Sequence, residues 1–277
     1  SDDARLAQVD ISPEVSHRSA SVDLQVLSDA REFLVALERE LEQRGYRWSG
    51  DLTNDRVQLE RERAGYLALS EEPGSEGLVN PWTLIDELDR SLPRDAFVSV
   101  DVGMHSFYGK KLRVFEPRTY IRSAGFGAMG YAFPGLLGAL EGAGPERRAA
   151  AVIGDGCLSM TLGEFETAAR RGTNLTLVVC NDGRFVSQQS HQRRRLEGRI
   201  VGTDFSPVDY AAVAEAQGVK GFVARTDAEA REAIRAALTM KGPSVVDARL
   251  DRSVQPATWI EGSGDARLAQ QRAAAVG

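Results

Sequence analysis

The chain has few cysteines, no excess of basic residues and no long apolar run. Its 277 residues include only Cys157 and Cys180, which excludes a disulfide framework and leads us to expect a reducing compartment, the cytoplasm. The 34 basic residues are outnumbered by 40 acidic ones, which argues against a nucleic-acid partner bound through a general basic field. No apolar run approaches the roughly 18 residues of a membrane span, so we expect neither a membrane helix nor a signal peptide.

In other respects the composition is that of an ordinary globular protein, with 42% hydrophobic and 27% charged residues. The length suits one large domain or two smaller ones. The N-terminal part contains one predicted strand at residues 5–11 and one predicted helix at 29–44. A polar, charged stretch at 48–75 follows and is typical of a linker. One strand and one helix are too few for a domain of their own.

From residue 80 onward, predicted strands and helices alternate. Short, β-rich apolar runs predict strands at 97–102, 149–153, 175–180 and 244–249. Helical patterns predict helices at 80–92, 130–141, 162–171, 208–216 and 228–240. This alternation is typical of an α/β fold with a doubly wound, mostly parallel sheet, in which ligands bind at the carboxyl ends of the strands.

Two acidic motifs follow neighbouring strands of this predicted sheet. Gly154-Asp155-Gly156 comes directly after the strand at 149–153, and Asn181-Asp182 comes directly after the strand at 175–180. The 25 residues between Gly156 and Asp182 suffice for a helix and a strand, so both motifs would end at the same edge of the sheet. Carboxylates that converge there suit Mg²⁺, and the amides after Gly156 would face phosphate groups. The alternative for Gly-Asp-Gly taken alone is a tight turn.

The two motifs at this spacing resemble the signature of thiamine-diphosphate enzymes. The resemblance is closest to the acetolactate-synthase-like group of 2-oxo acid decarboxylases and carboligases. Phe97-Val-Ser-Val-Asp-Val-Gly-Met-His105 is similar to the strand and turn that contact the cofactor diphosphate in that family. Arg122-Ser-Ala-Gly-Phe-Gly-Ala-Met-Gly-Tyr-Ala-Phe-Pro134 is similar to the loop that contacts the aminopyrimidine. The resemblance implies the thiamine-diphosphate-binding fold over about 80–250, with thiamine diphosphate and Mg²⁺ as cofactors.

The resemblance also implies roles for individual residues. Around the cofactor it places Gly103, Met104, His105, Gly127, Met129, Gly156 and Cys157. The carbonyl of Gly127 would accept a hydrogen bond from the pyrimidine amine, and Met129 would support the bent conformation of the cofactor. The metal ligands would be Asp155, Asp182 and the backbone carbonyl of Arg184.

Enzymes of this family have a pyrimidine domain, a middle domain and a diphosphate domain. The resemblance implies the end of the middle domain at 1–46, a linker at 47–79, the diphosphate and Mg²⁺ domain at 80–255 and a C-terminal tail at 256–277. The pyrimidine domain, with the glutamate that activates the cofactor, would belong to a partner subunit forming the N-terminal half. If the polypeptide was instead cut, that domain would belong to the missing part. A dimer of heterodimers is expected in the split case.

The implied activity is that of a lyase or transferase that decarboxylates a small 2-oxo acid and transfers or ligates the resulting acyl or aldehyde unit. This chain would supply the diphosphate and metal side of the site, and the partner would supply the glutamate. The alternative is a non-catalytic assembly or regulatory subunit with the same fold. An enzyme is favoured by the intact pair of acidic motifs, and the alternative by the missing domain.

Four positions depart from the family pattern. Asp182 stands where Asn is commoner, Val186 where Gly is often found, and Cys157 where Ser is frequent. His191 falls where acetolactate synthases carry a tryptophan that selects the substrate. A histidine there predicts a preference for a polar or anionic substrate group, and the alternative is that His191 belongs to a solvated basic face with the arginines that follow it.

Three further features have a plain structural alternative. Gly125-x-Gly127-x-x-Gly130 matches a dinucleotide-binding fingerprint, but the acidic residue expected about 20 positions later is missing, so nicotinamide binding is not favoured. His105 is either a ligand contact or a satisfied structural histidine. Cys157 and Cys180 are expected to pack as small hydrophobic residues.

Overall fold

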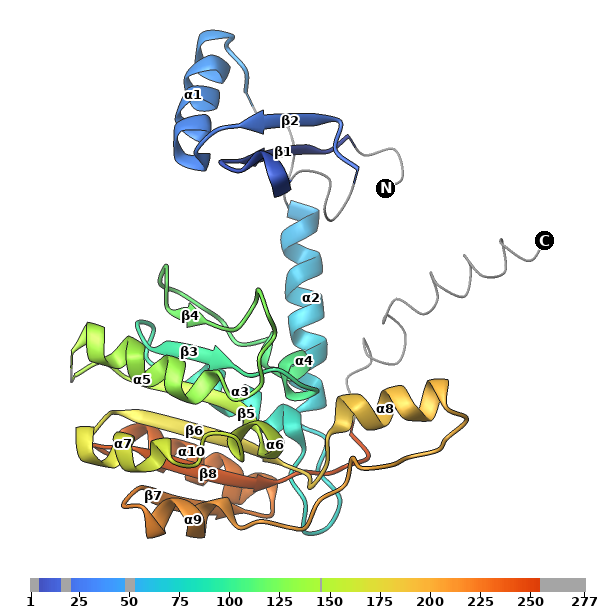
Figure 1. Cartoon of the computed structure of the whole chain (residues 1–277), viewed down its shortest axis with the longest axis vertical. Helices are drawn as coiled ribbons and strands as arrows, with labels where there is room; N and C mark the ends of the chain where they lie inside the picture. Colours follow the sequence, from blue (N-terminus) through green and yellow to red (C-terminus); the bar gives the residue numbers. More distant parts are fainter. Residues whose placement is uncertain (1–4, 16–20, 48–52, 145, 255–277) are drawn as a thin grey trace. The chain divides into compact units, whose positions relative to one another are not determined.

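The structure, a computed structural model, describes residues 5–15, 21–47, 53–144 and 146–254 (Figure 1). It divides into two units, Ser1–Gln58 and Leu59–Gly277. The predicted tail at 256–277 lies outside the described residues. Among the helices that are described, none is both long enough and apolar enough to cross a membrane.

Unit 1 contains a small parallel sheet and a helix. Strands β1 (Ala7–Asp10) and β2 (Leu24–Leu27) pair in parallel, with the short 3-10 helix η1 (Pro13–Val15) between them. Helix α1 (Ala30–Gln43) follows, and the side chain of Asp29 caps its first amides. The prediction of a single strand was wrong: β2 has only four residues, too few for its pattern to be recognised.

Helix α2 (Thr53–Leu69) occupies much of the stretch that was predicted to be a linker. The sequence did not indicate it, because its apolar residues are not confined to one face. The segment after α2 is bonded to the rest of unit 2. Asp227 accepts hydrogen bonds from the amides of Gly74 and Asn80, both at 2.8 Å. Asp251 accepts from the amide and the hydroxyl of Ser75 at 2.8 and 2.6 Å.

Unit 2 is built on a six-stranded sheet in the order β4-β3-β5-β6-β8-β7, and all of its paired strands are parallel. The strands are β3 (Phe97–Val100), β4 (Tyr120–Ile121), β5 (Ala149–Gly154), β6 (Leu175–Asn181), β7 (Lys220–Ala224) and β8 (Ser244–Arg249). The four predicted strands are confirmed to within two residues. Two strands were not predicted: β4 has only two residues, and β7 begins with Lys220 and Gly221, which are not typical of a strand.

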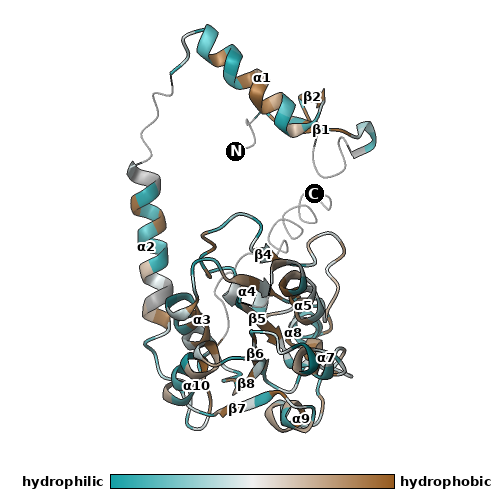
Figure 2. Cartoon of the chain, turned by 90° about the vertical axis from the view of Figure 1, so that its left-hand side faces the viewer, coloured by the Kyte–Doolittle hydropathy of each residue, from teal (hydrophilic) through white to brown (hydrophobic). Residues whose placement is uncertain are grey.

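Helices cover both faces of the sheet, because successive strand residues point to opposite sides. Val98 and Val100 pack in one apolar cluster, and Ala149 and Ala151 in the other. The first cluster is covered by α3 (Pro81–Ser91), α4 (His105–Gly109) and α10 (Asp227–Thr239). The second is covered by α5 (Ala132–Ala143), α7 (Glu164–Arg171) and α9 (Tyr210–Ala216). Figure 2 shows the hydrophobic strands between these two layers. The predicted doubly wound sheet is confirmed.

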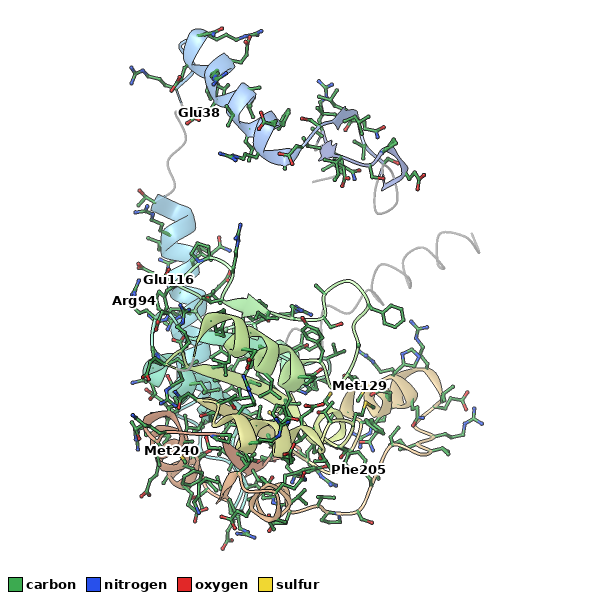
Figure 3. The ribbon with its side chains drawn as sticks, turned by 60° about the vertical axis from the view of Figure 1, so that its left-hand side comes forward. Glu38, Arg94, Glu116, Met129, Phe205 and Met240 are labelled. Carbon is green, nitrogen blue, oxygen red and sulfur yellow. The ribbon has the colours of Figure 1, made fainter. Side chains whose placement is uncertain are left out.

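The strand order reverses next to β3. The chain passes from β3 outward to β4 and then returns to β5 on the other side of β3. Because α4 and α5 pack on opposite faces, the connections diverge and leave a crevice at the carboxyl ends of β3 and β5, the usual ligand position in such sheets. Figure 3 shows Met129 and Phe205 toward this end of the sheet, and Arg94 and Met240 at the opposite end.

Asp227→Ala should lower the free energy of unfolding by about 1–3 kcal/mol, because two backbone amides lose their acceptor. Urea unfolding followed by circular dichroism measures the change. Glu232→Ala, which removes an exposed carboxylate from the same helix, is the control. Equal stability of the two variants would contradict the predicted role of Asp227.

Candidate cofactor and metal site

A cavity of about 240 Å³ lies at the carboxyl ends of β3, β5, β6 and β8. Nine of the ten predicted site residues line it: Gly103, Met104, His105, Met129, Asp155, Gly156, Cys157, Asp182 and Arg184. They come from four separate stretches of sequence, which the parallel sheet brings to one edge. Gly127 is the one predicted residue that does not line the cavity.

The side chain of Asp155 connects the loop after β5 to the loop after β6. It is the first residue of α6 (Asp155–Leu158) and is 2% exposed. Its Oδ1 accepts from the amide of Gly156 at 2.7 Å, and its Oδ2 accepts from the amides of Gly183 and Asp182 at 2.6 and 3.1 Å. The carboxylate therefore fixes the position of the loop that carries the second acidic motif.

Asp182 and Arg184 lie on that loop and are both nearly buried. The Nε of Arg184 lies 3.6 Å from Oδ2 of Asp182, and that Nε has no hydrogen-bond partner among the described residues. The two terminal nitrogens of Arg184 donate to Oε1 of Gln189 and to the carbonyl of Arg252, both at 3.1 Å. The guanidinium is thus held in place beside the carboxylate.

Burial makes both carboxylates difficult to ionise in this cavity. Loss of hydration raises the pKa of Asp155 to about 6, against three backbone hydrogen bonds that lower it. The pKa of Asp182 is raised to about 7, first by burial and then by the nearby charge of Asp155, although Arg184 and Arg252 lower it. Two mutually repelling anions in a buried cavity are stabilised by a cation placed between them.

The turn after β3 forms the opposite wall. His105 is 6% exposed, and its Nε2 has no hydrogen-bond partner in the part of the chain that the structure describes. Burial lowers the pKa of His105 to about 4, so the ring is neutral at pH 7. The thiol of Cys157 donates to the carbonyl of Val102 at 3.1 Å, and burial raises the pKa of this thiol to about 12. The cysteine therefore contacts the turn as a neutral thiol.

The loop predicted to contact a pyrimidine is only partly at the cavity. Met129 lines it, whereas Gly127 has a left-handed backbone with φ of 70°. Phe126 is 97% exposed. The loop is anchored by the hydroxyl of Ser123, which accepts from the amide of Ala128 at 2.9 Å. The side chain of Phe126, at the tip of this loop, is therefore not buried by other residues of unit 2.

Sequence analysis missed two buried carboxylates that support the site. Asp101 accepts from the amides of Val102 and Ala132 at 2.7 and 3.2 Å, and so joins the β3 turn to the start of α5. Asp247 is fully buried and accepts from Nδ2 of Asn181 at 2.8 Å and from the amide of Tyr210 at 2.9 Å. An acidic residue within an otherwise apolar strand was the available signal for Asp247.

His191 lies in α8 (Val186–Arg195), is exposed and is not among the residues that line the cavity. Val186 and Gln188 of the same helix line the cavity instead. This position favours the alternative of a solvated basic face, with Arg193, Arg194 and Arg195 in the last turn of the helix. The preference for a polar substrate group that was predicted from His191 is therefore not supported.

Comparison with known proteins identifies the family. Residues 101–248 match the family described as "Thiamine pyrophosphate enzyme, C-terminal TPP binding domain"; thiamine pyrophosphate and thiamine diphosphate are the same compound. This match covers more than half of the chain. The chain belongs to the thiamine pyrophosphate enzymes. Within them it resembles the C-terminal half of the acetolactate synthases, as the sequence motifs predicted.

Individual relatives agree with this assignment. The acetolactate synthase large subunit of Corynebacterium glutamicum is 32% identical over 203 residues, which are 73% of this chain and 32% of the relative. The acetolactate synthase of Mycobacterium leprae is 29% identical over 254 residues, 88% of this chain and 40% of the relative. The sulfoacetaldehyde acetyltransferase of Castellaniella defragrans is 30% identical over 178 residues, 64% of this chain and 29% of the relative. The matched part is less than half of each relative.

The donor set at the carboxyl ends of β5 and β6 fits a small, hard cation. It offers the carboxylate oxygens of Asp155 and Asp182. Within the described ranges, no three His, Cys, Asp or Glu side chains are grouped to hold a metal. A cation bound by Asp155 and Asp182 would therefore complete its shell with carbonyl, water or ligand oxygens. Mg²⁺, which keeps few protein ligands, binds in this way.

Asp182→Asn should stabilise the metal-free protein at pH 8. The folded-state pKa of Asp182 lies above its unfolded value, so its stabilising contribution is present at low pH and is lost as pH rises through about 7. Removing the charge should raise the free energy of unfolding by about 1–3 kcal/mol at pH 8, since one pKa unit corresponds to about 1.4 kcal/mol.

Thermal unfolding in EDTA at pH 5 and pH 8 measures this effect. The variant should exceed the wild type at pH 8 and approach it at pH 5, and Glu232→Gln should match the wild type at both. A variant that is no more stable than the wild type at pH 8 would show that the carboxylate is not under electrostatic strain.

Proposed function

We propose that this chain is the C-terminal half of a thiamine-diphosphate- and Mg²⁺-dependent enzyme. The enzyme would decarboxylate a small 2-oxo acid and transfer or ligate the resulting acyl or aldehyde unit. The observation that carries this proposal is the pair of buried carboxylates at the ends of β5 and β6, in a cavity that the β3 turn closes from the other side. Family membership supports the cofactor, and the paired carboxylates support the metal.

Each wall of the cavity has a part in this proposal. Asp155, Asp182 and the carbonyl of Arg184 hold Mg²⁺. Gly103, Met104, His105, Gly156 and Cys157 surround the diphosphate. Met129 supports the rest of the cofactor, and the carbonyl of Gly127 accepts from its pyrimidine amine. Gly127 does not line the cavity. The contact between its carbonyl and the pyrimidine therefore requires that the pyrimidine domain cover the exposed loop around Phe126.

The bound cofactor supplies a carbon nucleophile and an electron sink for decarboxylation. The protein side chains orient it and exclude water. Asp155 and Asp182 hold a cation, and the positive charge of that cation offsets the negative charge of the diphosphate. The ring of His105 adds a hydrogen-bonding group beside the diphosphate.

The glutamate that activates the cofactor would lie on the pyrimidine domain, which an N-terminal-half polypeptide would supply. This arrangement is supported by the coverage of the relatives, which extend well beyond the matched part. The exposed Phe126 on the cofactor loop is also suited to an interface. We propose a dimer of two such heterodimers if the halves are separate chains, and a cytoplasmic location, since both cysteines are free.

A non-catalytic subunit is the second candidate, because Val186 places a branched side chain in the cavity wall where the family often has glycine. The relatives named above carry out more than one reaction, so the 2-oxo acid and the acceptor are not specified further. Binding of thiamine diphosphate with Mg²⁺ separates the enzyme from a subunit that has lost the cofactor.

Asp155→Ala should weaken Mg²⁺-dependent binding of inorganic pyrophosphate to the chain by more than about 10-fold, since even outer-shell partners of a metal typically contribute that much. Titration calorimetry measures the affinity, and circular dichroism checks the fold. Asp95→Ala, an exposed carboxylate before β3 at the opposite end of the sheet, should bind as the wild type does. Unchanged affinity in Asp155→Ala would exclude the metal assignment.

The chain alone should show no 2-oxo acid decarboxylase activity, because nothing in the described residues resembles a pyrimidine domain. Adding the N-terminal half should restore CO₂ release in the presence of thiamine diphosphate and Mg²⁺. The measurement is CO₂ release by the chain, by the N-terminal half and by their mixture. Turnover by the chain alone would contradict the divided site, and a mixture that binds the cofactor without turnover would favour the non-catalytic candidate.

A further inference from the structure

The imidazole of His105 is buried, yet one of its nitrogens is unsatisfied. His105 is the first residue of α4, directly after the β3 turn, and lines the same cavity as Asp155 and Asp182. Its Nε2 is shielded from solvent and has no partner among the described residues. A buried polar atom without a partner costs free energy and requires an explanation. A ligand in the cavity is the explanation that the position of the ring suggests.

Two glycines hold this ring from opposite walls. A Cβ atom on Gly103 would lie 2.7 Å from Cε1 of His105, and a Cβ atom on Gly154 would lie 2.8 Å from its Nδ1. Both distances are far shorter than van der Waals contact. Gly103 follows β3 and Gly154 ends β5, and these two strands are paired in the sheet. The Nδ1–Cε1 edge of the ring therefore fits between the two backbones only because both residues lack a side chain.

Gly154 is not required by its own backbone. Its φ of −76° and ψ of 151° are extended values that any residue adopts. The tight-turn alternative does not explain why this residue is glycine, because these backbone angles do not require one. By contrast, Gly103 has φ of 152°, so a side chain there would also strain the backbone. Gly154 is thus the position at which the ring of His105 alone excludes a larger residue.

We propose that Gly154 is a positioning residue that acts through His105. The absence of its side chain lets the imidazole occupy the slot between β3 and β5, with Nε2 left to donate, in the protonated ring, to a phosphate oxygen of the bound ligand. The identity of that ligand rests on the proposed function. The slot itself does not, because it is formed by Gly103, Gly154 and the ring of His105. Under this proposal Gly154, the first glycine of Gly-Asp-Gly, makes room for the ring of His105 after the β3 turn, and Asp155 binds the metal.

A double-mutant cycle tests this coupling. Gly154→Ala, His105→Ala and the double variant are titrated with inorganic pyrophosphate in the presence of Mg²⁺. Each single variant should bind about 10-fold more weakly than the wild type, because a hydrogen bond to a charged group is lost. The double variant should bind no more weakly than His105→Ala, since the added methyl group then has room. Gly138→Ala, at a helical glycine with no atom within 4 Å of the added Cβ, should bind normally.

The outcomes separate this proposal from the proposed function. If the double variant loses about 10-fold more affinity than His105→Ala, Gly154 acts on the neighbouring Asp155 and the positioning role is overturned. If His105→Ala binds pyrophosphate as the wild type does while Asp155→Ala does not, the role of His105 fails and the metal site stands. Should Gly154→Ala fail to fold, recovery of folding in the double variant supports the same clash.

A spectroscopic measurement does not depend on binding. The chain has three histidines, His17, His105 and His191, and His105→Ala assigns the Cε1–H signal of His105 in a ¹H–¹³C NMR spectrum. Gly154→Ala should shift that signal in the ligand-free protein and leave the signals of His17 and His191 in place. An unshifted His105 signal would mean that the ring does not occupy the slot and would overturn the proposal.

Discussion

The carboxylate of Asp155 binds three backbone amides from two separate segments of the chain. One amide belongs to its own turn after β5, and two belong to the loop after β6. This interaction sets the distance between the two loops and therefore brings Asp182 and Arg184 to the cavity. It is possible only because β5 and β6 are parallel neighbours, so that their carboxyl ends meet at one edge. The other walls of the site are arranged around this junction.

The same contact between Asp155 and the two loops places negatively charged carboxylates where water hydrates them poorly. Asp155 and Asp182 are both buried in the cavity, and Asp101 and Asp247 lie buried behind the loops that form it, each with its pKa raised by burial. Asp101 and Asp247 are satisfied by backbone amides and by Asn181. Asp155 and Asp182 line the cavity, as does His105, whose Nε2 has no hydrogen-bond partner among the described residues. Under the proposed function, a magnesium ion with a diphosphate would supply the positive charge and the hydrogen-bonding oxygens that these groups lack.

The fold and the residues that line the cavity could be predicted because they depend on local sequence patterns. Apolar runs marked β3, β5, β6 and β8, and two motifs directly after strands marked Asp155 and Asp182. Elements without such patterns were missed: α2 has no apolar face, β4 has two residues and β7 begins with Lys220 and Gly221. The supporting roles of Asp101 and Asp247 depend on amides distant in sequence, and the need for glycine at 154 depends on a ring 49 positions earlier in the chain. Contacts of this kind are set by the tertiary structure, so the local sequence does not reveal which groups are partners.

The central claim is that Asp155 and Asp182 share one cation at the carboxyl ends of β5 and β6. The most direct measurement is a crystal structure of the chain with its N-terminal half, thiamine diphosphate and Mn²⁺ in place of Mg²⁺, with anomalous scattering recorded for manganese. The account predicts one anomalous peak at about 2.1 Å from oxygens of both carboxylates, with diphosphate oxygens completing the shell. A bound cofactor whose metal lies elsewhere, or contacts neither carboxylate, would contradict it.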